Sequence, residues 1–220
     1  AITLSAVMCM AALTGCGGKS DSAKKTAKVI EVDLTDEQYA FGVDKDQPDL
    51  LKEVNQFVKD MKSDGTFDEI CNRYFGDGTP VPVKSAAYDE SKDQLVVATN
   101  AAFEPFEYMD GENYVGIDME IAKALADKLG KELVIQNMDF DAVCLSVGQH
   151  KCDVAMAGLT IKPDREEYVA FSDPYYSASQ KLITLSTDTE FDACKTADDV
   201  NKILEAKGSD LKIGFQNGTT

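Results

Sequence analysis

The fold is decided by residues 95–136, "LVVATNAAFEPFEYMDGENYVGIDMEIAKALADKLGKELVIQ". Two short apolar runs, 95–99 and 132–136, stand on either side of a helical run at 118–129 that stops at Gly130. Short apolar runs are typical of strands that are covered on both faces. A glycine directly after a periodic run marks the end of a helix. The stretch therefore predicts a strand, a helix and a second strand.

The same alternation continues beyond this stretch. We predict a helix at 140–149 and a third strand at 153–158, "DVAMAG". Strands and helices in this order favour an α/β fold, in which a parallel sheet carries helices on both faces. Ligands of such sheets bind beside the carboxyl ends of the strands. Those ends lie at residues 99–103, 138–140 and 157–165.

The flanking segments carry further periodic patterns. Amphipathic helices are predicted at 48–64 and 66–75, with Thr66 as the cap of the second. A segment without periodicity connects them to the first strand of the sheet. Towards the other end, Thr196 and Asp199 have capping-box spacing before a helix, and residues 211–215, "LKIGF", read as a strand.

The overall composition excludes several classes of function. The chain has 220 residues, enough for one large domain or two small ones, and a formal net charge of −17. This charge would repel phosphate backbones and anionic headgroups, so we expect no nucleic-acid partner and no basic membrane-docking patch. No run of 18 apolar residues occurs, so we predict no membrane span.

The first residues, "AITLSAVMCMAALTGCGGKSDSAKK", have the form of an export signal. The initiator Met and a lysine-rich start are missing, so we expect the sequence to begin inside its signal. Residues 13–16, "LTGC", resemble the lipobox of bacterial lipoproteins, in which the cysteine is lipidated. Cys16 is therefore the expected lipid site. A short buried helix with an incidental cysteine is the alternative.

The remaining cysteines and the single histidine do not suggest metal or thiol chemistry. No CxxC pair occurs, and His150 is expected at the surface, so we predict no metal and no cofactor. An exported location would permit disulfides. Because Cys71 and Cys144 fall at apolar helical positions, we favour buried thiols there.

Arg165 is one of only two arginines in a chain with 22 Lys and Arg together. A guanidinium binds a carboxylate through two parallel hydrogen bonds, which an ammonium does not reproduce. An ordinary surface ion pair with Asp164 or Glu166 is the alternative. Thr160 could add a hydroxyl donor to the same carboxylate, and the Gly158 carbonyl could accept from an ammonium.

Two phenylalanines follow the strand ends. Phe103 and Phe140 would form apolar walls for a ligand side chain, with cation–π attraction to an amine. Core packing of each ring is the alternative. Together with Arg165, these rings predict a site for a small zwitterion.

Three stretches, 96–130, 138–176 and 213–220, resemble the family 3 solute-binding proteins, the amino-acid receptors of ABC importers. The resemblance is strong over 95–184. It implies a type II periplasmic-binding-protein-like lobe 1, with a parallel-rich sheet flanked by helices, and the start of a second lobe. It also implies stacking aromatics at Phe103 and Phe140, a carboxylate clamp at Thr160 and Arg165, and a backbone acceptor at Gly158. Second-lobe contacts would come from Gly218, Thr219 and Thr220.

Residues 39–76 resemble the segment with which such proteins normally end, although here it comes first. A circular permutation and a remnant of a tandem copy are both open, and we favour permutation. It predicts that Leu51, Val54, Val58 and Met61 pack against the sheet of residues 95–184. The expected divisions are 1–16 truncated signal with lipobox, 17–38 flexible tether, 39–76 closing strand and helices of lobe 1, 77–93 linker, 94–187 lobe 1, and 188–220 crossover and incomplete lobe 2.

The resemblance implies the substrate-binding component of an ABC importer. It would capture an amino acid between two lobes and deliver it to a membrane permease, as a lipid-anchored extracytoplasmic monomer without enzymatic activity. Position 100 is often acidic in relatives that bind cationic side chains, so Asn100 favours a neutral or polar ligand. Alternatives are an enzyme resembling the cyclohexadienyl dehydratases, with Glu104 or Asp139 as the acid, a ligand-sensing input domain, and an adhesive lipoprotein.

Overall fold

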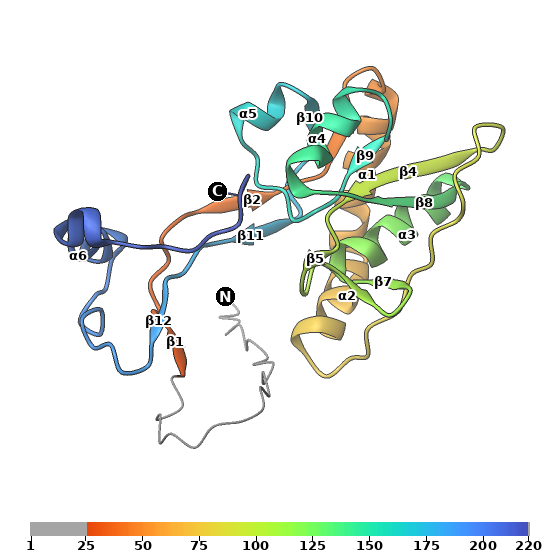
Figure 1. The fold of residues 1–220 in the computed structure, drawn as a ribbon. Helices are drawn as coiled ribbons and strands as arrows, with labels where there is room; N and C mark the ends of the chain where they lie inside the picture. The colour runs from red at the N-terminus through yellow and green to blue at the C-terminus, as the bar shows by residue number, and fades with distance from the viewer. Residues whose placement is uncertain (1–25, 220) are drawn as a thin grey trace, which may run out of the picture. The chain divides into compact units, whose positions relative to one another are not determined.

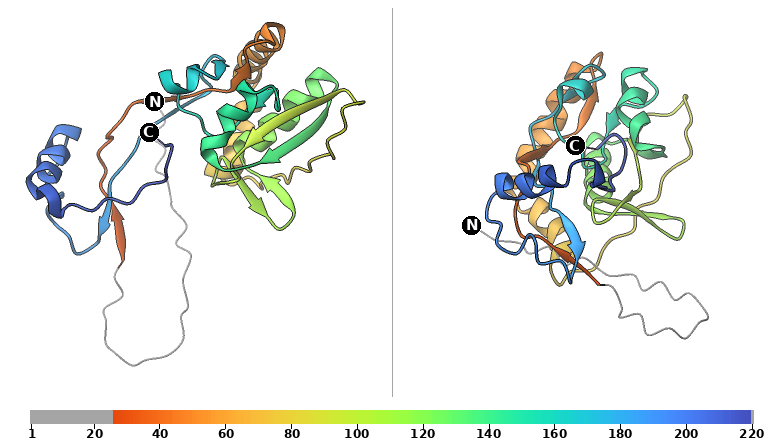
Figure 2. Two further views of the ribbon diagram at one scale, coloured as in Figure 1. Left: turned by 45° about the horizontal axis from the view of Figure 1, so that its top comes forward. Right: turned by 60° about the vertical axis from the view of Figure 1, so that its left-hand side comes forward.

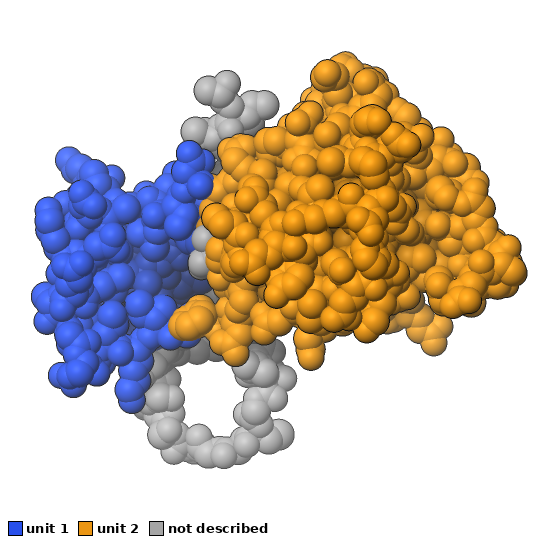
Figure 3. All heavy atoms as spheres, turned by 90° about the horizontal axis from the view of Figure 1, so that it is seen from above, with its two compact units in different colours: residues 1–36, 178–214 blue, residues 37–177, 215–220 orange. Residues whose placement is uncertain are grey.

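The computed structural model describes residues 26–219. The predictions for Cys16 and Thr220 therefore lie outside the described residues. The described residues form two compact units (Figure 3): unit 1 comprises residues 26–36 and 178–214, and unit 2 comprises residues 37–177 and 215–219. Each unit is thus assembled from segments that are distant in the sequence.

Unit 2 is built on a five-stranded sheet of order β10-β3-β9-β4-β8 (Figure 1). The strands are β3 (Gly42–Asp44), β4 (Gln94–Thr99), β8 (Glu132–Asn137), β9 (Val154–Ala155) and β10 (Val169–Phe171). The predicted parallel arrangement holds for β4, which pairs in parallel with β8 and β9 and lies beside β8 (Figure 1, and the left view of Figure 2). By contrast, β3 is antiparallel to both β9 and β10, so the sheet is mixed.

Helices cover both faces of this sheet, as predicted. Along β4, Val96 and Ala98 pack in one core cluster with Val143 and Val147 of α4 (Phe140–Gly148). Alternate strand residues point to opposite faces, so the buried Val97 points to the other side, where α3 (Ile117–Leu129) contacts β4 and β8. This double coverage explains why the strands read as continuous apolar runs.

The segment 39–76 supplies β3 and two helices to unit 2. Helix α1 (Pro48–Ser63) contacts β3, and α2 (Thr66–Phe75) contacts α1 and α3. Val54, Val58 and Met61 are buried, whereas Leu51 is only half-buried. The pattern missed Phe57, which is also buried.

The predicted cap at Thr66 is wrong. Gly65, with φ of 91°, occupies the N-cap position of α2, and the Thr66 N–H donates to Asp64 Oδ1 at 2.9 Å. After α2 the chain follows the unit with little regular structure, held by an isolated bridge between Val83 and Tyr114 and by the Ala86 N–H, which donates to the Leu133 carbonyl.

The sequence patterns missed several short elements of unit 2. An antiparallel sheet of β5 (Ala102–Phe103), β6 (Glu107–Asp110) and β7 (Asn113–Val115) lies between β4 and α3 in the sequence. Strands of two to four residues are too short to show an alternating pattern. The other missed elements are β2 (Glu37–Tyr39), which pairs with β11 (Tyr176–Ala178), and the single turn α5 (Pro163–Glu166).

Unit 1 contains an antiparallel pair, β1 (Ala27–Val29) with β12 (Ile183–Leu185). Its helix α6 (Ala197–Lys207) begins with the predicted capping box and is followed by the 3₁₀ turn η1 (Gly208–Asp210). The core of the unit includes Ile30, Val32, Phe191 and Val200.

Two predictions for this part of the chain are wrong. Residues 26–38, expected within a flexible tether, contain β1, most of β2 and two buried core side chains. Residues 211–215 form no strand, because no described strand pairs with them. An isolated run of β-forming residues has no ladder to join.

Candidate functional site

The carboxyl ends of the parallel strands form one edge of the sheet in unit 2. β4 ends at Thr99, whose carbonyl accepts from the Met138 N–H at 3.0 Å. Asn100 Nδ2 donates to the Met138 carbonyl at 2.7 Å, so the two loops after β4 and β8 are tied together. The remaining amide atom, Asn100 Oδ1, lies 3.4 Å from Gln216 Nε2. Asn100 therefore presents a hydrogen-bond acceptor at this edge.

Arg165 lies on α5, immediately after this edge, and its side chain is buried. Nη1 donates to the Thr160 carbonyl at 2.8 Å and Nη2 donates to the Gly218 carbonyl at 2.9 Å. The guanidinium carbon lies 5.2 Å from the centre of the Phe140 ring. No ion pair to Asp164 or Glu166 is present, so the surface-pair alternative is wrong. Each terminal nitrogen of the guanidinium carries a second N–H, so two donors remain for bidentate binding of an anion.

Thr160 is also buried, but its hydroxyl does not point to an open position. Oγ1 donates to Glu37 Oε2 at 2.7 Å. Glu37 lies on β2, which forms an isolated bridge with this loop between Tyr39 and Thr160. The expected role of Thr160 in holding a carboxylate thus requires its hydroxyl to exchange partners. Sequence reasoning missed Glu37, because β2 is contributed by a remote segment.

Gly158 and Phe103 form a second group of predicted residues. Gly158 has φ of 53°, a left-handed conformation that favours glycine. A Cβ placed on it would lie 3.0 Å from Phe103 Cε1, so the ring and the backbone are already in contact. Phe103 stacks on Phe106 with centroids 5.5 Å apart and remains 40% exposed. This leaves Phe103 as an accessible aromatic wall beside a backbone turn.

The segment 215–219 belongs to unit 2, and it brings Gly218 to Arg165. Gly218 has φ of 76°, and a Cβ there would lie 1.9 Å from Asp141 Oδ1. The left-handed conformation favours glycine, and a side chain here would also require the Asp141 carboxylate to move. Thr219 does not join the clamp in this structure, because its Oγ1 donates to the Gln216 carbonyl at 2.7 Å.

A buried carboxyl pair lies beneath the Gly158 turn, and sequence reasoning missed it. Asp118 Oδ2 accepts from the Gly158 N–H at 2.9 Å, and Asp118 Oδ1 accepts from the Tyr175 hydroxyl at 2.6 Å. Burial raises the pKa of Asp118 to about 6. Burial, followed by the charge of Asp118, raises the pKa of Glu107 well above its usual range.

Thiol chemistry is not supported at this edge. The four described cysteines form no disulfide. Burial raises the pKa of Cys144 to about 11, even though Arg165 acts in the opposite direction. Burial likewise raises the pKa of Cys71 to about 12. These side chains are therefore neutral thiols near pH 7, and the thiolate is the reactive form.

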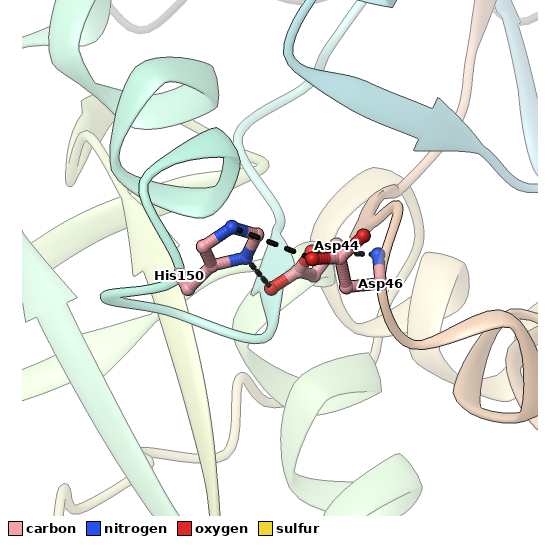
Figure 4. Close-up of side chains that lie close together, drawn as sticks. All are labelled: Asp44, Asp46 and His150. Atoms are coloured by element: carbon pink, nitrogen blue, oxygen red, sulfur yellow. Dashed lines mark hydrogen bonds and ion pairs between the residues drawn. The ribbon is translucent and has the colours of Figure 1, made fainter.

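Among the described residues, three side chains of types that bind metals lie close together: Asp44, Asp46 and His150 (Figure 4). His150 Nδ1 lies 2.8 Å from the buried Asp44 Oδ2, and Nε2 lies 3.6 Å from Asp46 Oδ2. Hydrogen bonding to Asp44 and then its charge raise the pKa of His150. An imidazolium between two carboxylates accounts for this geometry. The exposed ring of His150 is thus paired with Asp44, a residue of β3.

The comparison with known families matches this architecture. Residues 12–77 and 95–213 match the model of the bacterial extracellular solute-binding proteins, family 3. The chain belongs to this family. Its α/β fold, with helices on both faces of a mixed sheet and a candidate site at the strand ends, is that of a family 3 solute-binding protein.

Curated relatives of this solute-binding protein include transport proteins and one enzyme. The arginine-binding extracellular protein ArtP of Bacillus subtilis is 35% identical over 58% of this chain and 53% of its own. ABC transporter arginine-binding protein 1 of Escherichia coli is 33% identical over 58% of this chain and 48% of its own. Cyclohexadienyl dehydratase of Pseudomonas aeruginosa is 31% identical over 56% of this chain and 47% of its own.

The chain spans about half the length of the curated relatives it matches. Among its described residues, no helix is long and apolar enough to cross a membrane.

Proposed function

We propose that this chain is the substrate-binding component of an ABC importer and captures a free amino acid at the strand ends of unit 2. The observation that carries this proposal is the buried guanidinium of Arg165. It is held by two backbone carbonyls, it has no carboxylate partner among residues 26–219, and it lies beside the Phe140 ring. Such a group suits the carboxylate of an amino acid, since bidentate binding to an arginine is both strong and directional.

The ligand side chain is proposed to donate hydrogen bonds. Asn100 uses its amide nitrogen on Met138, and its oxygen accepts a long hydrogen bond from Gln216 Nε2, so the second lone pair of this oxygen is proposed to accept from a ligand donor. Arginine, histidine and glutamine all supply such donors. The names of the curated relatives favour a cationic ligand, whereas the sequence expectation from Asn100 was a neutral or polar one.

Calorimetry with arginine, citrulline, histidine and glutamine tests both parts of this proposal. Citrulline has nearly the shape of arginine without its charge. A much higher affinity for arginine would assign the cationic class, and equal affinities would assign the neutral or polar class. Absence of binding to any amino acid would contradict the proposed function.

The clamp is tested by Arg165→Lys. Loss of the forked geometry should weaken amino-acid binding by roughly tenfold to a hundredfold, the range expected for hydrogen bonds to a charged group. Arg73→Lys is the matched control, because Arg73 pairs with Glu120 and is the only other arginine. Unchanged affinity in Arg165→Lys would show that bidentate geometry is not required.

The family description supports an extracytoplasmic location. We propose in addition that Cys16 carries a lipid anchor and that a membrane permease receives the ligand from a monomeric protein. Metabolic labelling with a radioactive fatty acid should mark the wild type and not Cys16→Ser. Equal labelling of the two would contradict the anchor.

A dehydratase activity is the second candidate, favoured by the 31% identity to cyclohexadienyl dehydratase. It would need a general acid, and Glu104 and Asp139 stand nearest in sequence to the two aromatic walls. Conversion of prephenate, followed by nuclear magnetic resonance, separates the two functions. Turnover that is lost in Glu104→Gln or Asp139→Asn would favour the enzyme.

A further inference from the structure

The most deeply buried acidic groups of unit 2 are the carboxyls of Glu107 and Asp118, which are both 0% exposed. Glu107 lies on β6 and Asp118 lies in the first turn of α3. Within residues 26–219, no Lys, Arg or His lies within ion-pair distance of either carboxyl. Two uncompensated charges at this depth would be very costly, so the pair retains a proton.

The contacts show which member is ionised. Asp118 accepts hydrogen bonds from the Gly158 N–H and from the Tyr175 hydroxyl, and it lies at the N-terminus of α3, where a negative charge is stabilised. Glu107 receives no hydrogen bond from an N–H or O–H donor among the described residues, and its hydrogen-bond partner is the carboxyl of Asp118. Glu107 is therefore the neutral acid, and Asp118 is the carboxylate.

The other titratable groups around the pair are Tyr39 and Glu37 on β2, Cys71 on α2, and Tyr175 before β11. Burial raises the pKa of both tyrosines and raises that of Cys71 to about 12, so all three stay neutral. Glu37 Oε2 accepts from the Thr160 hydroxyl, and its charge adds to burial in raising the pKa of Tyr39.

Asp118 holds two parts of the candidate site, the Gly158 turn and the turn that carries Phe103. Its carboxylate fixes the N–H of the left-handed Gly158. Its own N–H donates to the Phe106 carbonyl at 2.9 Å, and the Phe106 N–H donates to the Phe103 carbonyl at 2.9 Å. One residue thus holds the backbone turn and the aromatic turn that face each other.

We propose that Asp118 is a positioning residue for the amino-acid site, and that the proton on Glu107 keeps it in place. When Glu107 ionises, repulsion between the two carboxylates displaces Asp118 and releases the Gly158 turn, and ligand affinity falls. This inference rests on the proposed function. It adds to that function a residue that does not touch the ligand, and it predicts that ligand binding depends on pH.

The first test compares isosteric variants of two buried acids on α3. Asp118→Asn should weaken amino-acid binding about tenfold to a hundredfold, because a hydrogen bond to a charged acceptor is lost at Gly158. Glu120→Gln is the matched control. Glu120 accepts from Arg73, Tyr74 and Val81, with no contact to Gly158, so this change should lower stability and leave the affinity unchanged.

The second test follows pH from 5 to 8.5 in the full chain. The dissociation constant of the wild type should rise with pH, by up to about tenfold per unit above the ionisation of Glu107. Glu107→Gln cannot ionise, so its dissociation constant should not follow this rise. Because both proteins use the same ligand, titration of the ligand itself cancels in the ratio.

A readout without ligand separates this inference from the proposed function. Above about pH 7, where Asp118 is ionised, the Gly158 amide resonance should shift with pH in the wild type and stay constant in Glu107→Gln. If no amino acid binds but the resonance titrates in this way, the proposed function fails and the proton-dependent turn stands. If the two proteins share one pH profile, or if Asp118→Asn binds like the wild type, the inference is overturned.

Discussion

At the scale of single residues, buried polar contacts hold the residues of the candidate site. Arg165 is held by carbonyls, Thr160 by Glu37, and Gly158 by Asp118. Rare residue types and glycines were visible in the sequence, so Arg165 and Gly158 could be singled out. Their partners could not be predicted, because acidic residues are frequent throughout the chain and burial selects the few that matter.

His150 should make stability depend on pH. Its pKa is raised in the folded state, so its contribution is fully present below about pH 6.5, the unfolded value, and is lost as pH rises through the folded value. Urea unfolding between pH 5 and 9 should show this loss in the wild type and not in His150→Gln. A wild-type loss that persists unchanged in the variant would contradict the pairing with Asp44.

Glu107 should also make stability fall as pH rises, but this fall should begin at a lower pH than the fall caused by His150. Because the folded state keeps a proton that the unfolded chain has lost, stability should fall from about pH 4.5 upward until the raised pKa is passed, by up to about 1.4 kcal/mol per pH unit. Because Asp118 contributes a similar fall up to its own pKa of about 6, Glu107→Gln should remove the part of this slope above about pH 6 in urea unfolding. Parallel slopes in the two proteins would show that Glu107 is charged in the folded state.

At the scale of elements, the long helices followed from the sequence and the short strands did not. Helices α1, α3 and α4 each bury several apolar side chains over at least nine residues, whereas α2 fully buries only Ile70. Strand β9 has only two residues and derives its stability from its two neighbours in the sheet. Patterns of this length carry too little information to distinguish a strand from a loop.

The attachment of α2 to α3 can be tested at Glu120. Tyr74→Phe removes a 2.6 Å hydrogen bond to this buried carboxylate and should lower the free energy of unfolding by about 1.5–3 kcal/mol. Glu69→Gln is the control, since Glu69 is exposed and lies 4.0 Å from Arg73. It should change stability by less than about 0.5 kcal/mol. Equal effects would mean that the network does not anchor α2.

The packing of α1 is tested by Met61→Ala. Met61 is almost completely buried, so the loss of its side chain should lower the free energy of unfolding by about 2–5 kcal/mol. Lys59→Ala on the exposed face of the same helix should have little effect. A tolerant Met61 site would indicate that α1 is not an integral part of unit 2.

At the scale of the whole molecule, unit 2 draws on segments that are separated in the sequence. Strand β3, from residues 39–76, is hydrogen-bonded between β9 and β10. This placement is consistent with the proposed permutation, which stays a prediction. The chain as a whole is strongly acidic, whereas the charge that matters most in the candidate site is the cation of Arg165.

Removal of residues 1–76 should therefore prevent unit 2 from folding. The loss of β3 would leave β9 and β10 without their shared partner and would uncover the face of the sheet that α1 covers. Circular dichroism and urea unfolding of residues 77–220 should show no cooperative transition. Addition of a peptide covering residues 37–76 should restore one, and cooperative folding without it would contradict an integral role for β3.

The sequence by itself determined the α/β class, the parallel core of the sheet, the main helices and the residues Arg165, Phe103, Phe140 and Gly158 as site candidates. These follow from local periodicity, turn chemistry and rare residue types, which are properties of neighbouring positions. Only the tertiary structure decided that β3 enters the sheet, that Thr160 bonds to Glu37, and that Asp118 and Glu107 share a buried position. These contacts join residues more than ten positions apart, and the chain must bury them together before their charges and hydrogen bonds take effect.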